Sequence, residues 1–200
     1  MTILKHDFYV RDTRVVASEL LGKKLVRRYK GRLISGLICE TEAYLGVSDS
    51  ACHAYRRKTE RNAVIFGRAG VAYVYFVYGM HYLLNIVTEA EQDPCAVLIR
   101  GLVPIDGIKD MQRHRGATAK DLTNGPAKLC QALAVDKALN GWNLTTGRKL
   151  WVEEQTLLPQ QLIRTGPRIG IDYARPADRH AALRFWINDP ANGVTNVKSA

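Results

Sequence analysis

The sequence predicts an α+β protein, a single domain over residues 1–200 with a curved, mostly antiparallel β-sheet surrounded by helices. The chain has 200 residues, 46% of them hydrophobic, which is enough for one substantial core. Its strand-like segments follow one another across short turns. Helical segments are interspersed without the regular strand–helix–strand rhythm that a parallel sheet requires.

The first elements are a short helix and a β-hairpin. Asp12 can cap a helix, and Gly22 stands where the end of that helix favours glycine. Segments 23–29 and 33–42 then alternate or run apolar on either side of Lys30-Gly31. This pattern is typical of two antiparallel strands joined by a tight turn. The second strand therefore delivers its last residues to the start of the next loop.

Residues 44–68 are polar, basic and weakly periodic, so we expect a long functional loop with short helical pieces. The next three segments are rich in tyrosine, valine, isoleucine and leucine, which favours strands at 71–78, 81–88 and 95–102. They complete the central part of the predicted sheet.

A charged segment at 106–123 is expected to be partly helical or mobile. A helix at 127–134 follows, because Pro126 suits the first turn of a helix. The late strands are predicted at 149–153, 168–172 and 183–187.

The chain is strongly basic. It has 29 Lys and Arg residues against 19 Asp and Glu residues, a net charge of +10 and a pI near 9.6. This excess favours nucleic acid, an anionic membrane or an acidic substrate as partner. No apolar run approaches the roughly 18 residues that a membrane span needs. The first residues lack the apolar segment of a signal peptide, so a cytoplasmic protein is expected.

Cysteine spacing and short motifs argue against a metal or a cofactor. None of the four cysteines forms a C-x-x-C pair, so reduced, buried thiols are expected, although two disulfides are conceivable. The sequence has no Walker loop, G-x-G-x-x-G, H-E-x-x-H or G-x-S-x-G motif. It therefore indicates no nucleotide cofactor, no metal and no serine nucleophile.

Residues 40–85 hold the densest group of candidate functional side chains. Glu40 and Glu42 lie two positions apart, so a strand would turn both to one face, where either could deprotonate a water. Four of the nine tyrosines fall between residues 73 and 82. They could stack on a planar base, although a packed aromatic core has the same pattern. Glu42 could equally be a surface carboxylate paired with an arginine.

Several motifs, in this order along the chain, resemble the alkyladenine (3-methyladenine) DNA glycosylase family, in its bacterial form. They are E-T-E-A-Y-L-G at 40–46, R-N at 61–62, Y-V-Y-F-V-Y-G-M at 73–80, Asn85, V-L-I-R at 97–100, G-P-A-K-L-C-Q-A-L at 125–133 and R-I-G-I at 168–171. The resemblance implies a single α+β glycosylase domain that acts in base excision repair. The sequence departs from the family pattern at 54–58 and 89–93, and these departures leave the preferred lesion open.

The resemblance also implies a reaction. Such enzymes flip a damaged purine out of double-stranded DNA and hydrolyse its N-glycosidic bond with an activated water, without a lyase step or a cofactor. Glu42 then corresponds to the general base, and Arg100 and the backbone carbonyl of Ile169 to the groups that hold the water. A monomer associated with the nucleoid is expected.

Base recognition follows from the same resemblance. Tyr44 corresponds to the residue stacked on one face of the flipped base, and His53 and Tyr75 to the groups on the other. Tyr78 corresponds to the side chain that fills the gap left in the duplex, and Asn85 to the pocket-floor residue that rejects normal guanine. The candidates for DNA-phosphate contacts are Arg56, Arg57, Arg61, Arg115 and Lys128, each of which could instead be a solvated surface charge.

Two other functions compete with this interpretation. A non-catalytic nucleic-acid-binding module would show the same basic surface and stacking tyrosines, but it gains nothing from a carboxylate in a cationic groove. A formyl- or methionyl-type transferase would need a folate or nucleotide motif, and the sequence shows none.

Overall fold

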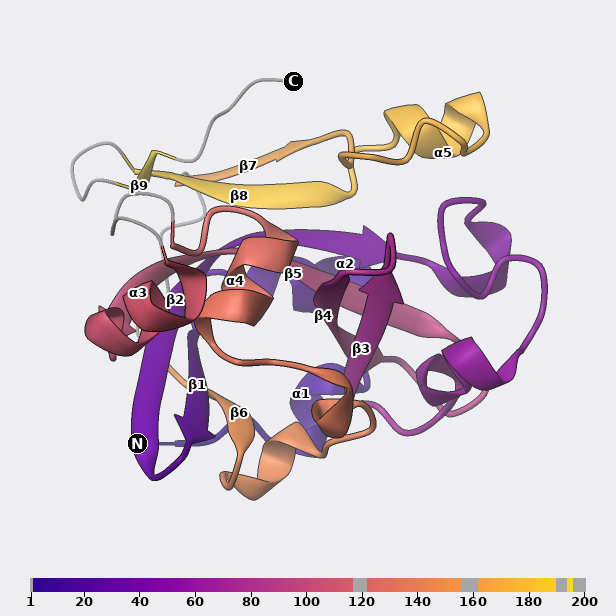
Figure 1. Cartoon of the computed structure of the whole chain (residues 1–200). Coiled ribbons are helices and arrows are strands. Elements are labelled where there is room, and N and C mark those ends of the chain that lie inside the picture. Colours follow the sequence, from indigo (N-terminus) through magenta and orange to yellow (C-terminus); the bar gives the residue numbers. More distant parts are fainter. Residues whose placement is uncertain (1, 117–121, 156–161, 190–193, 196–200) are drawn as a thin grey trace.

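The computed structural model describes residues 2–116, 122–155, 162–189 and 194–195. Figure 1 shows one curved sheet with helices packed around it. The α-helices are α1 (His6–Tyr9), α2 (Thr13–Glu19), α3 (Ile108–Arg115), α4 (Pro126–Ala132) and α5 (Pro176–His180). The strands are β1 (Lys24–Tyr29), β2 (Arg32–Tyr44), β3 (Ala72–Val77), β4 (His81–Thr88), β5 (Cys95–Asp106), β6 (Leu150–Glu153), β7 (Ile163–Gly166), β8 (Arg184–Asp189) and β9 (Val194–Thr195).

The sheet is antiparallel throughout its described strand pairs. Its main path runs β3-β4-β5-β2-β1-β6, and β8 joins it beside β2 while also pairing with β7 and β9. The long strand β2 pairs with β1 in its first half and with β8 at residues 40–42, while β5 follows it on the other side. The predicted α+β fold with a mostly antiparallel sheet is confirmed.

The first predicted elements form for the expected reasons. The Asp12 carboxylate caps α2 by accepting hydrogen bonds from the backbone N–H groups of Arg14 and Val15. Strands β1 and β2 pair tightly around Lys30 and Gly31, whose φ angles of 48° and 78° are those that a two-residue hairpin turn with right-handed strand twist requires. The hairpin therefore needs no distant contact to set its register.

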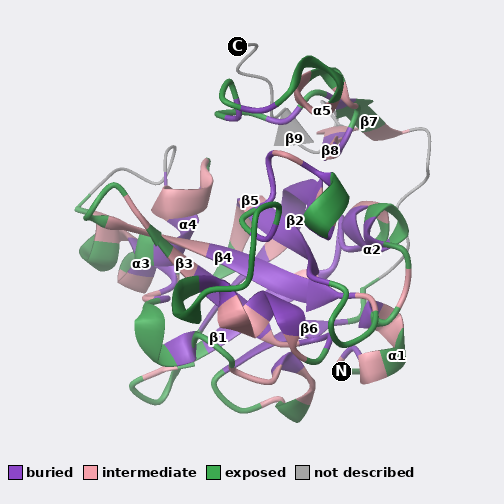
Figure 2. Ribbon diagram, turned by 90° about the vertical axis from the view of Figure 1, so that its right-hand side faces the viewer, coloured by how far each residue is buried: buried purple, intermediate pink, exposed green. Residues whose placement is uncertain are grey.

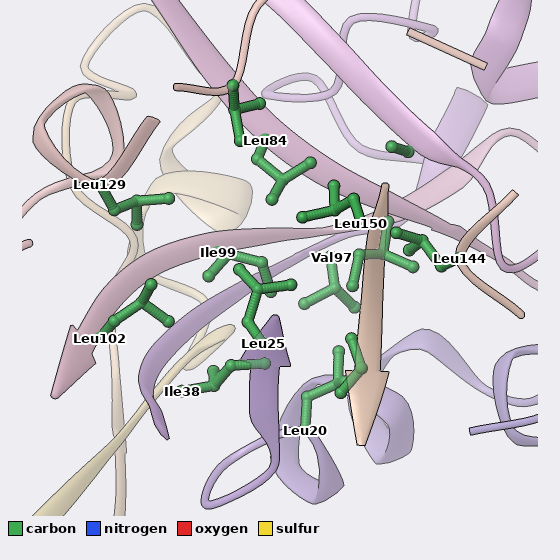
Figure 3. Close-up of a cluster of buried hydrophobic side chains, with 14 of the residues drawn as sticks. Leu20, Leu25, Ile38, Leu84, Val97, Ile99, Leu102, Leu129, Leu144 and Leu150 are labelled. Carbon is green, nitrogen blue, oxygen red and sulfur yellow. The ribbon is translucent and has the colours of Figure 1, made fainter. Parts of the chain in front are cut away.

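The main core lies between the sheet and helices α2, α3 and α4. Figure 3 shows the strand residues Leu25, Ile38, Val97 and Ile99 gathered with Leu129 of α4 and their neighbours. Figure 2 shows that buried residues run along β2, β4 and β5, while the surrounding loops are exposed. Helix α4 packs on β4 and β5, and α3 packs on α4. All four cysteines are buried, reduced thiols, as predicted.

A second apolar cluster lies beneath the long loop after β2. This loop cluster contains Cys52, Ala54, Ile65, Phe66, Tyr73, Val87 and Ala96. The loop itself carries two short 3-10 helices, η1 (Gly46–Ser48) and η2 (Glu60–Phe66), as expected for a long loop with short helical pieces. Further 3-10 helices are η4 (Lys137–Leu139) and η5 (Leu144–Thr146).

One predicted strand is wrong. Residues 168–172 form no strand, and the strand of this region is β7, five residues earlier. The physical reason lies in their hydrogen bonds: the Arg168 side chain is buried against Asp49, and the Ile169 N–H is used by the Glu42 carboxylate instead of by a neighbouring strand. The prediction also missed α1, α5 and β9. In the charged segment 106–123, α3 is confirmed as helical, and residues 117–121, including Lys120, lie outside the described residues.

None of the helices in the described part of the chain is both long and apolar enough to cross a membrane.

Candidate active site

A pocket of about 500 Å³ brings together side chains from distant parts of the sequence, a volume within the usual range for small-ligand sites. Its lining includes seven of the residues predicted for catalysis, base binding and the wedge: Tyr44, His53, Tyr75, Tyr78, Asn85, Arg100 and Ile169. Arg61 also lines it. The predicted general base, Glu42, lies directly behind this lining, where it contacts Tyr44 and Ile169.

Glu42 is fully buried, with an exposed fraction of 0%. Its carboxylate accepts hydrogen bonds from the Tyr44 hydroxyl and the Ile169 N–H, both at 2.8 Å, and the Arg100 Nε lies 3.3 Å away. Burial raises the pKa of Glu42 above its ordinary value, while Arg100 and the two hydrogen bonds act in the opposite direction. A carboxylate with a raised pKa beside a pocket is suited to accept a proton from water.

Glu40 lies on the same strand but has different partners. Its Oε1 accepts from the Arg100 Nε at 3.2 Å and from Arg184 at 3.3 Å. Glu40 therefore pairs with two arginines, of which only Arg100 lines the pocket, whereas Glu42 contacts three groups of the lining, Tyr44, Ile169 and Arg100. This geometry distinguishes two carboxylates that the sequence pattern alone left equivalent.

A local irregularity of the sheet positions the arginine between these carboxylates. The β2–β5 register shifts here: Ile38 stands opposite Leu102, Glu40 opposite Gly101 and Thr41 opposite Ile99, so the pairing steps over Arg100 on β5. Such bulges bend a strand and redirect side chains, and they are common next to active sites. The bulge places Arg100 within reach of both carboxylates.

The aromatic part of the pocket is built by one stack and one separate ring. The rings of His53 and Tyr75 are stacked with centroids 3.7 Å apart and planes 23° apart. The Tyr73 hydroxyl lies 3.3 Å from the His53 Nδ1 atom. Although His53 borders the solvent, the protein atoms crowded around its ring, together with the positive charge of Arg61, lower its pKa to about 4. His53 is therefore neutral at pH 7.

Tyr44 contributes the separate ring. Burial, and then the neighbouring Glu42 carboxylate, raise the pKa of Tyr44 well above its ordinary value, so its hydroxyl stays protonated and donates to Glu42. The guanidinium carbon of Arg168 lies 4.7 Å from the centre of the ring. Arg168 is absent from the pocket lining, so it covers Tyr44 from outside the pocket.

Asn85 stands on β4 opposite Tyr73 of β3. Its amide nitrogen donates to the backbone carbonyls of Tyr73, at 3.1 Å, and Leu83, at 3.4 Å. These bonds hold the amide in place and leave the Oδ1 atom for a ligand. Period-two alternation explains which strand residues reach the pocket: Tyr75 and Val77 on β3, and His81, Leu83 and Asn85 on β4.

Tyr78 occupies the tip of the β3–β4 hairpin. Its φ of 53° and that of Gly79, 68°, lie in a tight three-residue turn at 78–80, where the Met80 N–H donates to the Val77 carbonyl and Val77 pairs with His81. The side chain is 87% exposed. A core-packing role for Tyr78 is therefore excluded, and the exposed ring stands beside the pocket.

The five candidate phosphate ligands differ in their surroundings. Arg56 and Arg57 are exposed on the long loop. Arg61 lies 4.4 Å from the Tyr75 ring centre and donates to the Phe76 carbonyl, so it belongs to the pocket wall. Arg115 donates to Gln131 at 2.5 Å, and Lys128 is half-buried on the first turn of α4.

Sequence reasoning missed a second group of functional residues. Arg184 of β8 pairs with Glu40, and Tyr173, four residues after Ile169, lines the pocket. The start of α4, which the sequence motif at 125–133 does mark, reaches the pocket through Pro126 and Ala127. Alternation from Tyr75 and Asn85 could have found Val77 and Leu83. No local signal marks Arg184 or Tyr173, because only the tertiary fold brings them here.

Among the described residues, one group could hold a metal ion: Glu89, Asp93 and Cys95, whose ligand atoms lie within 4.8 Å of one another. It is separate from the pocket lining. Glu89 already accepts hydrogen bonds from the Thr13 backbone and side chain, and burial raises the pKa of Cys95 to about 12. A thiol that resists deprotonation is a poor metal ligand.

Comparison with known proteins identifies the family of the chain. The family model for methylpurine-DNA glycosylase matches residues 7–191. A Clostridium perfringens protein is 43% identical over 93% of this chain and 96% of its own length, and a Carboxydothermus hydrogenoformans protein is 46% identical over 94% and 96%. A Chlorobaculum tepidum protein is 50% identical over 86% and 82%. Each carries the provisional name of a 3-methyladenine DNA glycosylase. The chain belongs to the methylpurine-DNA glycosylase family.

Proposed function

We propose that this protein is a monofunctional DNA glycosylase of base excision repair. It takes damaged purines of the 3-methyladenine type out of double-stranded DNA and hydrolyses the N-glycosidic bond with an activated water. Family membership supports the reaction class. The observation that carries the site assignment is the buried Glu42 carboxylate, held by Tyr44, Ile169 and Arg100 at the back of an aromatic pocket.

Glu42 acts as the general base. The water attacks the anomeric carbon of the sugar, its proton passes to Glu42, and the purine leaves with the bonding electrons. Arg100 balances the charge of the two carboxylates and, with the Ile169 carbonyl, holds the water. The described lining of the pocket contains no lysine, which agrees with attack by water instead of by an amine.

The aromatic rings bind the extruded base. Tyr44 stacks on one face, and the His53–Tyr75 stack offers the other. Alkylated purines carry positive charge on the ring, which aromatic faces favour electrostatically. Flipping costs less for a lesion that pairs poorly, which adds to the selectivity.

Asn85 excludes normal guanine by its volume. Its amide nitrogen is engaged with two backbone carbonyls, so the free Oδ1 atom would attract an amino group if there were room for a hydrogen bond. Rejection of the guanine amino group must therefore come from contact at the pocket floor.

Tyr78 fills the space that the extruded nucleotide leaves in the duplex. The exposed ring at the tip of a tight hairpin turn is well placed for such a wedge. The phosphates are contacted by the exposed loop arginines Arg56 and Arg57, with Arg115 and Lys128 as further candidates, whereas Arg61 contributes to the pocket wall beside Tyr75. The protein works as a monomer on double-stranded DNA, in the cytoplasm with the nucleoid.

The test is an excision assay on duplexes that each carry one defined lesion, scored as abasic sites after alkaline cleavage. Release of 3-methyladenine or 7-methylguanine, with unmodified duplex left intact, is the expected result. A protein that binds lesion DNA tightly but produces no abasic sites would be the non-catalytic binding module instead.

A further inference from the structure

The pocket wall formed by Ile169, Gly170, Ile171 and Tyr173 is tied to the loop after β2 by one buried arginine, Arg168. The Arg168 side chain is 0% exposed. It donates to both carboxylate oxygens of Asp49, to the Ala43 carbonyl at 3.0 Å and to the Asp178 carbonyl at 3.2 Å. These four hydrogen bonds join the end of β2 and the turn after it to residues 168 and 178, more than a hundred positions later in the sequence.

Asp49 completes the junction from the other side. Besides Arg168, its carboxylate accepts the N–H groups of Leu45 and Ala51, both at 3.0 Å. The carboxylate therefore organises the turn that follows Tyr44 and leads to His53. Ser50 adds a second tie by donating to Asp178 at 2.5 Å and accepting the Arg175 N–H at 2.9 Å.

Arg168 touches the proposed catalytic apparatus at two points without lining the pocket. Its guanidinium covers the outer face of Tyr44. It is also the residue directly before Ile169, whose N–H donates to Glu42 at 2.8 Å. Displacement of Arg168 would therefore move the stacking ring and the hydrogen-bond donor of the base together.

We propose that Arg168, locked by Asp49, is the positioning residue of the active site: it holds Tyr44 in its stacking plane and presents the Ile169 N–H to Glu42. This inference rests on the proposed function. The guanidinium suits the role because its planar fork can serve two carboxylate oxygens and two carbonyls at once. An ammonium group lacks this geometry, so lysine at this position keeps the charge and loses the alignment.

A purely structural role for Arg168 would have different consequences. Loss of the buried pair would then lower thermal stability and leave the folded enzyme fully active. A positioning role changes the chemistry of the folded enzyme. In particular, loss of the Ile169 N–H should raise the pKa of Glu42 further, because that hydrogen bond favours the carboxylate. The other charged or titratable groups around Glu42 are Arg100, Glu40 with its partner Arg184, and the Tyr44 hydroxyl.

The experiment compares Arg168→Lys with Lys23→Met. Lys23 is also a buried cation, 4% exposed and paired with Glu154, but it lies outside the pocket lining. Single-turnover excision of a 7-methylguanine duplex is measured across pH at a temperature where both variants are folded. Arg168→Lys should lower the rate constant by about 10²-fold, as expected for a misplaced reacting group. It should also shift the acidic limb of the pH–rate profile to higher pH. Lys23→Met should show the wild-type rate constant and the wild-type acidic limb of the pH–rate profile.

Ser50→Ala serves if Arg168→Lys does not fold, because it loosens the same junction without leaving a buried charge. It should shift the acidic limb in the same direction by a smaller amount. Titration of Glu42 by carbon NMR in the free protein gives a reading that is independent of activity. A Glu42 pKa unchanged from wild type in the folded variants, with rates equal to those of Lys23→Met, overturns the inference. Absence of excision by the wild-type protein would contradict the proposed function instead.

Discussion

The two walls of the pocket are built in different ways. One wall consists of alternate residues on β3, β4 and β5, including Tyr75, Leu83, Asn85 and Leu98, held by continuous backbone pairing. The other consists of Tyr44 at the end of β2, Ala51 and His53 of the following loop, and the irregular segment 169–173. In this wall the segments are held together by side-chain hydrogen bonds and by the Arg168–Asp49 ion pair.

The two walls therefore differ in how strongly a single substitution disturbs them. A strand wall repeats one geometry at every second residue, so a single substitution leaves the remaining backbone hydrogen bonds in place. The irregular wall depends on a buried ion pair between residues 119 positions apart. Removal of one partner leaves the other charge buried and unpaired, which is costly. Glu42 stands where the walls meet, on a strand but held by Ile169 of the irregular wall.

The largest expected effect comes from Glu42→Gln, at the junction of the walls. Loss of the general base should lower single-turnover excision by about 10²- to 10⁴-fold, while lesion-DNA affinity stays within a few-fold of wild type. Glu40→Gln, the control two residues away, should have a much smaller effect. Equal losses in both variants, or full activity in Glu42→Gln, would show that the base is misassigned.

The same substitution also has a signed effect on stability. Because the folded pKa of Glu42 is raised above its unfolded value, its contribution favours folding at low pH and is lost as the pH rises through the folded pKa. A neutral glutamine escapes this loss. Glu42→Gln should therefore unfold at a higher temperature than wild type at pH 8, with the difference shrinking toward pH 4 in calorimetry.

The next largest effect is expected on stability, when the ion pair of the irregular wall is broken. Asp49→Asn leaves Arg168 buried without its counterion, and we expect a loss of about 3–5 kcal/mol in the free energy of unfolding. Val77→Ala removes a half-buried side chain from the strand wall and should cost only about 1 kcal/mol. Urea titration measures both. Similar losses would abolish the distinction between the two walls.

Tyr78→Ala tests the tip of the strand wall. Loss of the wedge should weaken binding to lesion duplexes by roughly 10-fold, a loss typical of one stacking interaction, and less for poorly paired lesions. The melting temperature should hardly change, because the ring is exposed. Phe76→Ala, which removes a ring packed on Tyr82 outside the pocket lining, is the aromatic control. It should lower stability without altering lesion discrimination.

The salt dependence of DNA binding separates the cations of the loop. Arg56→Ala or Arg57→Ala should reduce the slope of log affinity against log salt by about 0.9, equally for damaged and undamaged duplex. Arg61→Ala should instead weaken lesion binding with the slope nearly unchanged, because Arg61 lies on Tyr75. If the slope of log affinity against log salt drops only in Arg61→Ala, Arg61 is a phosphate ligand and the assignment of Arg56 and Arg57 is wrong.

The smallest expected signal is a gain of function in the strand wall. Asn85→Ser removes volume at the pocket floor and should permit slow excision of normal guanine, while the rate on adenine lesions changes little. Long incubation of unmodified duplex, followed by abasic-site detection, measures the gain. Unchanged discrimination would locate selectivity in the energetics of flipping alone.

The elements with local signals could be predicted from the sequence. The Asp12 cap, the Lys30-Gly31 turn and the tyrosine-rich hairpin depend on neighbours a few residues away, and each formed as expected. The motifs at 40–46 and 73–80 likewise indicated the family that the comparisons confirm. Two-residue periodicity correctly placed Tyr73 and Tyr75 on one face, where their ring centres lie 5.7 Å apart.

Tertiary structure alone decided the rest. Segment 168–172 has the composition of a strand, yet buried bonds to Asp49 and Glu42 replace strand pairing there. The strand bulge that turns Arg100 toward both carboxylates, and the arrival of Arg184 beside Glu40, have no local signature. Charged side chains are satisfied by whichever partner the fold brings near, and for these residues the partners lie tens of residues or more away in the sequence.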